Sequence, residues 1–141
     1  MVVHLVGTVI VRRPMTFMKF ACFGLAGAAG ALARLWLAEL FTRHAASHMP
    51  WGTWAVNLVG CFFFGFVWTL AEERNAVSPE FRFFVLAGFM GAFTTFSSYI
   101  FESVDLVRNG AVAYAIINII GQNLAGVISL LAGMAIARSV G

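Results

Sequence analysis

The chain has 141 residues, of which 61% are hydrophobic and 11% are charged, and its formal net charge is +3. A soluble domain of this length would need a far more charged surface, so the composition indicates an integral membrane protein. Its four long apolar runs, described below, predict an all-α fold. The small positive charge concerns topology and lipid headgroups, and nucleic acid is not an expected partner. Cys22 and Cys61 lie in apolar runs without disulfide or zinc spacing, which predicts two small buried hydrophobic side chains.

Residues 1–19 precede the first predicted span. Their apolar run ends at Arg12-Arg13 and is shorter than the ~20 residues that a spanning helix needs. A signal peptide carries its positive charge before the apolar part, whereas here the charge follows it. We therefore expect residues 1–19 to be a dispensable extension or the product of a misplaced start codon, and residues 20–138 to form one four-helix transmembrane domain.

The first predicted span covers about residues 20–41 and is rich in glycine and alanine, which let helices approach closely in lipid. A nucleotide-binding glycine loop would need a preceding strand, which is missing from the pattern. Arg34 is a cation within this span, at a cost of ~2.5–3.5 kcal/mol. It either reaches the interface or attracts an anion into a vestibule. His44 and His48 follow in a polar loop and are interpreted as solvated, since no third metal ligand is evident.

The second predicted span covers about residues 51–70, with tryptophans near both ends that suit the membrane interfaces. Asn57 lies about two turns inside it. An amide in hydrocarbon is costly unless it is hydrogen-bonded. Two interpretations stay open, an interhelical hydrogen bond and an amide donor offered to an anion.

The third predicted span, about residues 83–101, contains the most unusual stretch of the chain. Two glycines weaken the helix, and four hydroxyl side chains that follow offer its backbone alternative partners: Gly88, Gly91, Thr94, Thr95, Ser97 and Ser98. This pattern predicts a helix broken in mid-membrane. Irregular backbone at that depth survives only where it is buried in protein or lines a wet cavity, so we expect a polar ligand or ion here.

The fourth predicted span covers about residues 111–137. Tyr114, Asn118 and Gln122 follow one another at four-residue steps, which places them on one face of a helix. They form either a polar seam between helices or a ladder of donors along a pore wall, and a lipid-facing stripe is excluded. Four narrow helices can hardly enclose a selective path alone, so an oligomer is expected.

The polar groups within the spans are hydroxyls, amides and one arginine. Glu39 lies near the end of the first span and Glu102 just past the third, so no carboxylate is expected in mid-span. This argues against a proton-coupled exporter, and no catalytic constellation supports an enzyme. A small anion fits best, because amide and hydroxyl protons can replace its water shell. Phe96 either packs or presents positive ring-edge hydrogens to that anion.

Lysine and arginine set the orientation of a membrane protein. One predicted side holds both termini and the connection between spans two and three, with Lys19, Arg74, Arg82 and Arg138 besides the two arginines of the extension. The other side holds Arg43 and Arg108, together with Arg34 if its side chain reaches that interface. The whole chain favours termini inside, but without residues 1–19 the balance permits insertion both ways.

Three segments, taken together and in order, resemble the Fluc (CrcB) fluoride channels over residues 20–138. They read Gly27-Ala-Ala-Gly-Ala-Leu-Ala-Arg34, Trp51-Gly-Thr-Trp-Ala-Val-Asn57-Leu-Val-Gly60 and Gly88-Phe-Met-Gly-Ala-Phe-Thr-Thr-Phe-Ser97. The resemblance implies a fluoride-selective channel in the cell inner (plasma) membrane that gives passive fluoride efflux and hence fluoride resistance. It also implies an antiparallel, dual-topology dimer with two pores.

The resemblance also implies roles for individual residues. Asn57 becomes a fluoride ligand and Phe96 the first of two pore phenylalanines. Backbone carbonyls of Gly91 and Thr94 hold one structural Na⁺ at the dimer centre. The remaining positions that match the pore motif and its polar track are Thr95, Ser97, Asn118, Gln122 and Gly126.

Two departures from the family pattern stand out. Tyr99 occupies the place of the second pore phenylalanine, because the motif reads Phe96-Ser-Ser-Tyr99 where Phe-Ser-Thr-Phe is usual. Gly126 stands where serine is frequent. These changes leave a second hypothesis open, that the chain is one subunit of a heterodimer with a paralogue. A four-helix small-molecule exporter is the more distant alternative.

Overall fold

The computed structural model describes residues 16–43 and 48–140, which are helical and contain no strand. Four helical segments are long and apolar enough to cross a membrane: Phe17–Thr42, Trp51–Glu72, Pro79–Arg108 and Val112–Ser139. This confirms the predicted all-α class with four spans. Most of the predicted extension and His44 lie outside the described residues.

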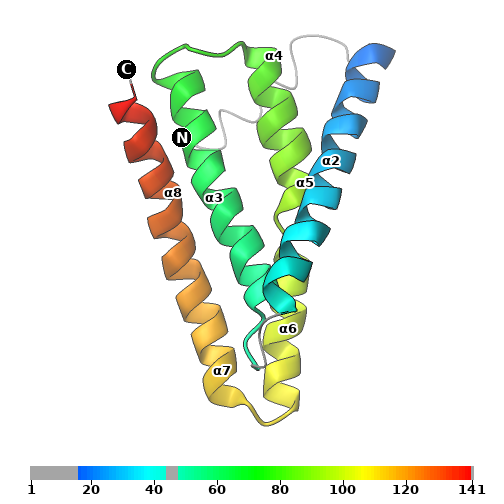
Figure 1. The fold of residues 1–141 in the computed structure, drawn as a ribbon, viewed down its shortest axis with the longest axis vertical. Coiled ribbons are helices and arrows are strands. Elements are labelled where there is room, and N and C mark those ends of the chain that lie inside the picture. Colours follow the sequence, from blue (N-terminus) through cyan, green and yellow to red (C-terminus); the bar gives the residue numbers. More distant parts are fainter. Residues whose placement is uncertain (1–15, 44–47, 141) are drawn as a thin grey trace.

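Two of the four segments are continuous helices, and two are composite (Figure 1). The first is α2 (Phe17–Thr42) and the second is α3 (Trp51–Glu72). The third consists of α4 (Pro79–Arg82), η1 (Phe83–Met90), α5 (Gly91–Phe93) and α6 (Phe96–Arg108). The fourth consists of α7 (Val112–Ile116), η2 (Ile117–Gly121) and α8 (Gln122–Ser139), and both η elements are wider π-helical turns.

The third segment is longer than the sequence predicted. It begins where the Ser78 hydroxyl accepts from the Phe81 N–H at 3.2 Å, with Pro79 at the first helical position. It ends near Gly110, whose φ of 76° closes the turn. Glu102 therefore lies inside α6, so its predicted place in a loop was wrong. Charged side chains do not end a helix by themselves, whereas these capping residues do.

Glycines set the close helix contacts. A Cβ on Gly133 of α8 would lie 2.0 Å from the Phe62 carbonyl oxygen of α3, and one on Gly65 would lie 2.3 Å from the Leu130 carbonyl oxygen. On α2, a Cβ on Gly30 would lie 2.2 Å from the carbonyl oxygen of Phe89. These backbones approach each other because no side chain separates them, as expected for helices in lipid.

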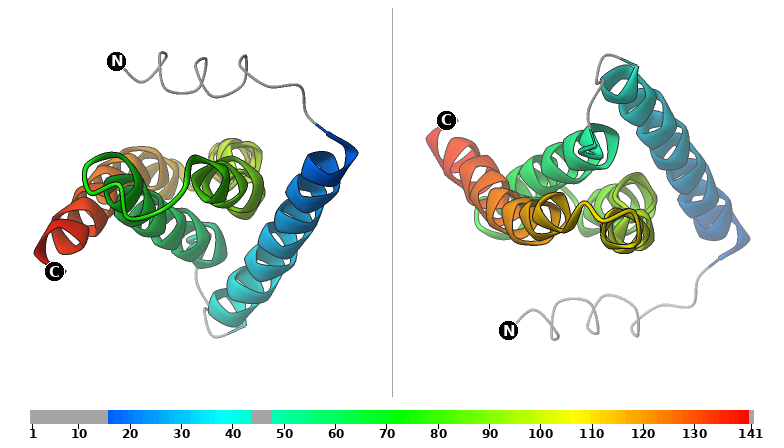
Figure 2. Two further views of the ribbon diagram at one scale, coloured as in Figure 1. Left: turned by 90° about the horizontal axis from the view of Figure 1, so that it is seen from above. Right: turned by 90° about the horizontal axis from the view of Figure 1, so that it is seen from below.

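The first helix leaves most of its surface uncovered. It packs with one side on α3, η1 and α5, and Figure 2 shows it lying across the edge of the other helices. Leu32 and Trp36 are each 67% exposed. Cys22 is exposed on the same helix, so its predicted burial was wrong for the single chain. This apolar face is available to lipid or to another protein chain.

Polar contacts join the ends of α3 and α8 at the end of the molecule where the chain terminates (Figure 1). Arg138 donates to both carboxylate oxygens of Glu73 at 2.7 and 2.6 Å. The Arg74 guanidinium donates to the carbonyls of Ala137 and Val140, which end α8. The hydrogen bonds from Arg138, supported by its positive charge, hold the pKa of Glu73 below its ordinary value.

Candidate functional site

Thr94 and Thr95 interrupt the helical backbone between α5 and α6. Thr94 has ψ 157° and Thr95 has φ −142° and ψ 112°, both extended conformations. Asn57 of α3 meets this break: its Oδ1 accepts from the Thr95 N–H at 2.9 Å, and its Nδ2 donates to the Thr95 carbonyl at 3.2 Å. One side-chain amide therefore satisfies both backbone groups of Thr95, which would otherwise be costly to bury.

The break also changes the hydrogen bonding of two backbone carbonyls. In an unbroken helix the N–H groups of Thr95 and Ser98 would donate to the carbonyls of Gly91 and Thr94. Here the Thr95 N–H donates to Asn57 instead, and the Ser98 N–H donates to the Thr95 hydroxyl at 3.3 Å. The carbonyls of Gly91 and Thr94 therefore lack their helical donors. Gly91 is exposed in the single chain.

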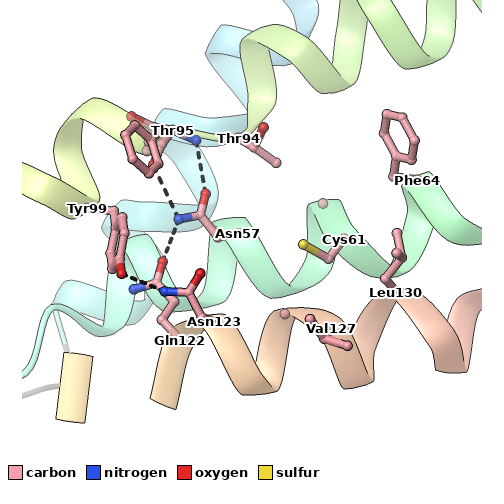
Figure 3. A pocket seen from close by; sticks show the side chains of 13 residues that line it. Asn57, Cys61, Phe64, Thr94, Thr95, Tyr99, Gln122, Asn123, Val127 and Leu130 are labelled. Atoms are coloured by element: carbon pink, nitrogen blue, oxygen red, sulfur yellow. Dashed lines mark hydrogen bonds between the residues drawn. The ribbon is translucent and has the colours of Figure 1, made fainter. Parts of the chain in front are cut away.

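A cavity of about 410 Å³ lies beside the break, between α3, α6 and α8 (Figure 3). Among the described residues, those that line it carry amides, hydroxyls, aromatic rings, a thiol and aliphatic groups but no charge: Asn57, Gly60, Cys61, Phe64, Thr94, Thr95, Phe96, Tyr99, Gln122, Asn123, Gly126, Val127 and Leu130. An anion therefore meets no repelling carboxylate at this wall, and it meets several N–H and O–H groups that can donate to it.

A chain of side-chain amides runs from the cavity into the interior. Asn57 Nδ2 donates to Gln122 Oε1 at 2.5 Å, and Gln122 Nε2 donates to Asn118 Oδ1 at 3.1 Å. Trp54 Nε1 donates to the same Asn118 oxygen at 2.6 Å, and Asn118 Nδ2 donates to the Ser103 hydroxyl at 2.9 Å. Asn118 is fully buried. In the single chain these amides bond to one another. This is what a polar seam between helices, one of the two interpretations of the sequence, predicts.

The structure brings most of the predicted site residues together but leaves four outside the cavity wall. Asn118 reaches the cavity only through Gln122, and Ser97 is exposed without lining it. Arg34 lies half-buried on α2, and Gly91 lies at the start of α5, before the break; neither lines the cavity. Phe96 lines the cavity although 75% of its surface is exposed. The cavity and the exposed face of α6 are therefore neighbours.

Sequence reasoning missed two polar contacts near the site. Asn123 lines the cavity and bonds to Tyr99, because the π-helical turn η2 changes the angular spacing of side chains along this segment. Glu102 lies within α6, where one carboxylate oxygen accepts from the Thr53 hydroxyl at 2.6 Å. Its other oxygen is buried without a hydrogen-bond partner among the described residues. Thr53 precedes Asn57 by four residues and so lies on the same face of the helix, which was the available signal that Thr53 also faces the other helices.

No cluster of three or more histidine, cysteine, aspartate or glutamate side chains arranged to hold a metal occurs among residues 16–43 and 48–140.

The fold and the cavity define a multi-pass membrane protein with an uncharged polar site beside a helix break. A family model described as "CrcB-like protein, Camphor Resistance (CrcB)" matches residues 21–134, and the chain belongs to this family.

The similarity of this chain to curated proteins extends over nearly the whole length of those proteins. A protein of Nitrosococcus oceani named "Fluoride-specific ion channel FluC" is 45% identical over 88% of this chain and 99% of its own. Proteins with the same name from Desulforapulum autotrophicum and Maridesulfovibrio salexigens are 50% and 43% identical, each over 86% of this chain, and over 98% and 97% of their own length. The chain is similar to each of them across all four helical segments.

Proposed function

We propose that this protein is a fluoride-selective ion channel, not an enzyme, and that it lets fluoride leave the cell passively and so lowers cytoplasmic fluoride. The near full-length similarity to proteins named fluoride-specific ion channels carries this proposal. The uncharged, donor-rich cavity supports it independently. We place the channel in the cell inner (plasma) membrane.

Fluoride would move along the cavity wall by exchanging hydrogen-bond donors. At the wall, Asn57 and Gln122 supply amide protons and Thr95 supplies a hydroxyl. Ser97 supplies a hydroxyl from the exposed face of α6, and Asn118 continues the polar track behind Gln122. Such donors replace the water that a small anion must shed. The rings of Phe96 and Tyr99 present edges with positive hydrogens, and their centroids lie 5.7 Å apart. The bond from Asn57 Nδ2 to Gln122 Oε1 must open for this amide hydrogen of Asn57 to reach the ion.

The channel unit would be an antiparallel, dual-topology dimer with the break of the third helix at mid-membrane. Two features of the single chain support a second copy beside it. Phe96 is largely exposed although it lines the cavity, and Gly91 lies open at the break. A second chain covers the face of α6 and closes the cavity from the side. The apolar face of α2 remains for lipid or for the partner.

One structural Na⁺ would lie at the centre of this dimer. The carbonyls of Gly91 and Thr94 lack their helical donors, since Thr95 and Ser98 donate elsewhere. Carbonyl oxygens are suitable ligands for a hard cation, so the residues present fit the ion. When bound, Na⁺ supplies positive charge between the two broken helices. Arg34 would act separately as a cationic group of an anion vestibule.

Fluoride efflux from liposomes that contain this purified chain alone tests the function, with chloride efflux as the control. Rapid fluoride release without chloride release supports a homodimeric channel. Absence of fluoride release from well-folded protein refutes the homodimer. Co-reconstitution with a paralogous four-helix chain then tests the heterodimer, and recovery of flux in that mixture supports it.

A further inference from the structure

Tyr99 of α6 and Asn123 of α8 form a polar pair at the cavity wall (Figure 3). Asn123 Nδ2 donates to the Tyr99 hydroxyl oxygen and to the Ile119 carbonyl oxygen, both at 2.7 Å. The Tyr99 hydroxyl donates to that same carbonyl at 3.3 Å. The two amide hydrogens and the hydroxyl hydrogen are therefore all used within one closed set of bonds.

The shape of η2 explains why Asn123 reaches this place. In an α-helix residue 123 would lie roughly 140° around the axis from Asn118, away from the polar face. The π-helical turn, with its i→i+5 spacing, brings residue 123 back toward the side of Asn118. Such turns are frequent at functional sites. Here it places a second amide on the cavity wall beside Gln122.

These contacts hold the Tyr99 ring at both ends. The ring is buried, with 6% of the residue exposed, and it packs against Phe96 at an interplanar angle of 54°. Its hydroxyl is held by α8 and η2. A phenylalanine at this position would need no hydrogen-bond partner, whereas a buried hydroxyl does. The hydroxyl and Asn123 therefore belong together as one unit.

We infer that Asn123 is a positioning residue of the pore: it holds the Tyr99 hydroxyl and thereby fixes the edge of this ring toward the fluoride path. This inference rests on the proposed channel function. It assigns Asn123 a role through Tyr99 and not through direct contact with the ion. Removing Asn123 should therefore matter when Tyr99 is present and lose its effect when residue 99 is phenylalanine.

Fluoride efflux from liposomes is measured for the full chain and for Asn123→Leu, Tyr99→Phe and the double variant. Losing one hydrogen bond to the ring predicts a rate about fivefold lower for Asn123→Leu. The rate of Tyr99→Phe is the reference for the double variant, which should match it, because Asn123 has no hydroxyl to hold when residue 99 is phenylalanine. Asn109→Leu is the control, because Asn109 also bonds four residues back, to Asp105 Oδ2 at 3.0 Å, away from the cavity. An equal loss from Asn123→Leu in both backgrounds overturns the inference.

A second measurement does not depend on conduction. The chain has 2 tyrosines. In a Tyr114→Phe background, biosynthetic 3-fluorotyrosine therefore reports on Tyr99 alone by fluorine NMR. Asn123→Leu should shift and broaden this resonance, and Asn109→Leu should leave it in place. An unchanged resonance overturns the inference even in a conducting channel. A shifted resonance in a protein that releases no fluoride supports the pair and counts against the channel function.

Discussion

Asn57→Asp separates two roles of the amide at the helix break. Aspartate keeps an oxygen that accepts the Thr95 N–H, now held at 2.9 Å, so one bond across the break survives. It loses the two amide hydrogens that reach the Thr95 carbonyl and Gln122 Oε1. It also adds a negative charge to a cavity wall that has none among its described residues. On the proposed function, the variant therefore turns a donor site for an anion into a repelling one.

The expected loss of fluoride flux is large. A unit charge 4 Å from the ion costs about 4 kcal/mol at an effective dielectric constant of about 20. Each 1.36 kcal/mol is a factor of ten, so fluoride efflux should fall about 1,000-fold. The assay is fluoride release from liposomes, recorded with a fluoride electrode after an ionophore removes the membrane potential. Asn109→Asp makes the same exchange at the end of α6 and should conduct like the parent chain.

Loss of fold would mimic loss of conduction, so the variant must also elute as the parent does in detergent. The prediction concerns the charge and not the lost hydrogen bonds alone. Asn57→Asp with flux within about threefold of the parent would refute the placement of Asn57 at the fluoride path. The same flux from Asn57→Asp and from Asn57→Leu, both strongly reduced, would show that bridging the break explains the whole effect.

Gly60→Ala should destabilise the fold by about 1–3 kcal/mol, because its Cβ would lie 2.2 Å from Thr94 Cγ2; thermal melting in detergent measures this. Arg138→Gln should reduce the acid sensitivity of melting. The folded state lowers the pKa of Glu73 below 4.5, so its stabilisation is present above pH 4.5 and is lost as pH falls through the lowered value. Melting at pH 7 and pH 4 compares the two proteins. Replacing Na⁺ by N-methylglucamine during purification should weaken the proposed dimer, and light scattering measures the mass; an unchanged dimer argues against the site at Gly91 and Thr94.

The sequence alone predicts the number and class of the helices because lipid makes long apolar runs unambiguous. It predicts their ends less well. The third segment extends from Pro79 to Arg108, since capping by Ser78 and the turn at Gly110 decide its limits. Glu102 thereby moves from a predicted loop into a helix, where Thr53 donates to it. Hydropathy cannot distinguish a charged residue in the last turns of a helix from one just beyond it.

The missed contacts of Asn123 at the cavity wall have a different cause. The polar face of the fourth segment was read with a regular spacing of four residues, which selects Asn118, Gln122 and Gly126. The π-helical turn between Ile117 and Gly121 breaks that spacing. The pattern of residues 117–121 gave no sign of this turn, so the regular spacing was kept through it. The irregular backbone of η2 therefore brings Asn123 to the cavity wall, and it is also the reason why a regular helical spacing does not predict Asn123 there.

The two interpretations of Asn57, interhelical bond and anion donor, do not exclude one another. Asn57 bonds to the N–H and the carbonyl of Thr95, which are fixed parts of the backbone, so these bonds stabilise the helix break. Its bond to Gln122 Oε1 joins two side chains, and the glutamine amide can rotate away. On the proposed function, fluoride takes the place of Gln122 Oε1 and receives an amide hydrogen without disturbing the backbone. Neither aspartate nor leucine can do both, because the first has no hydrogen to give and the second cannot bridge Thr95.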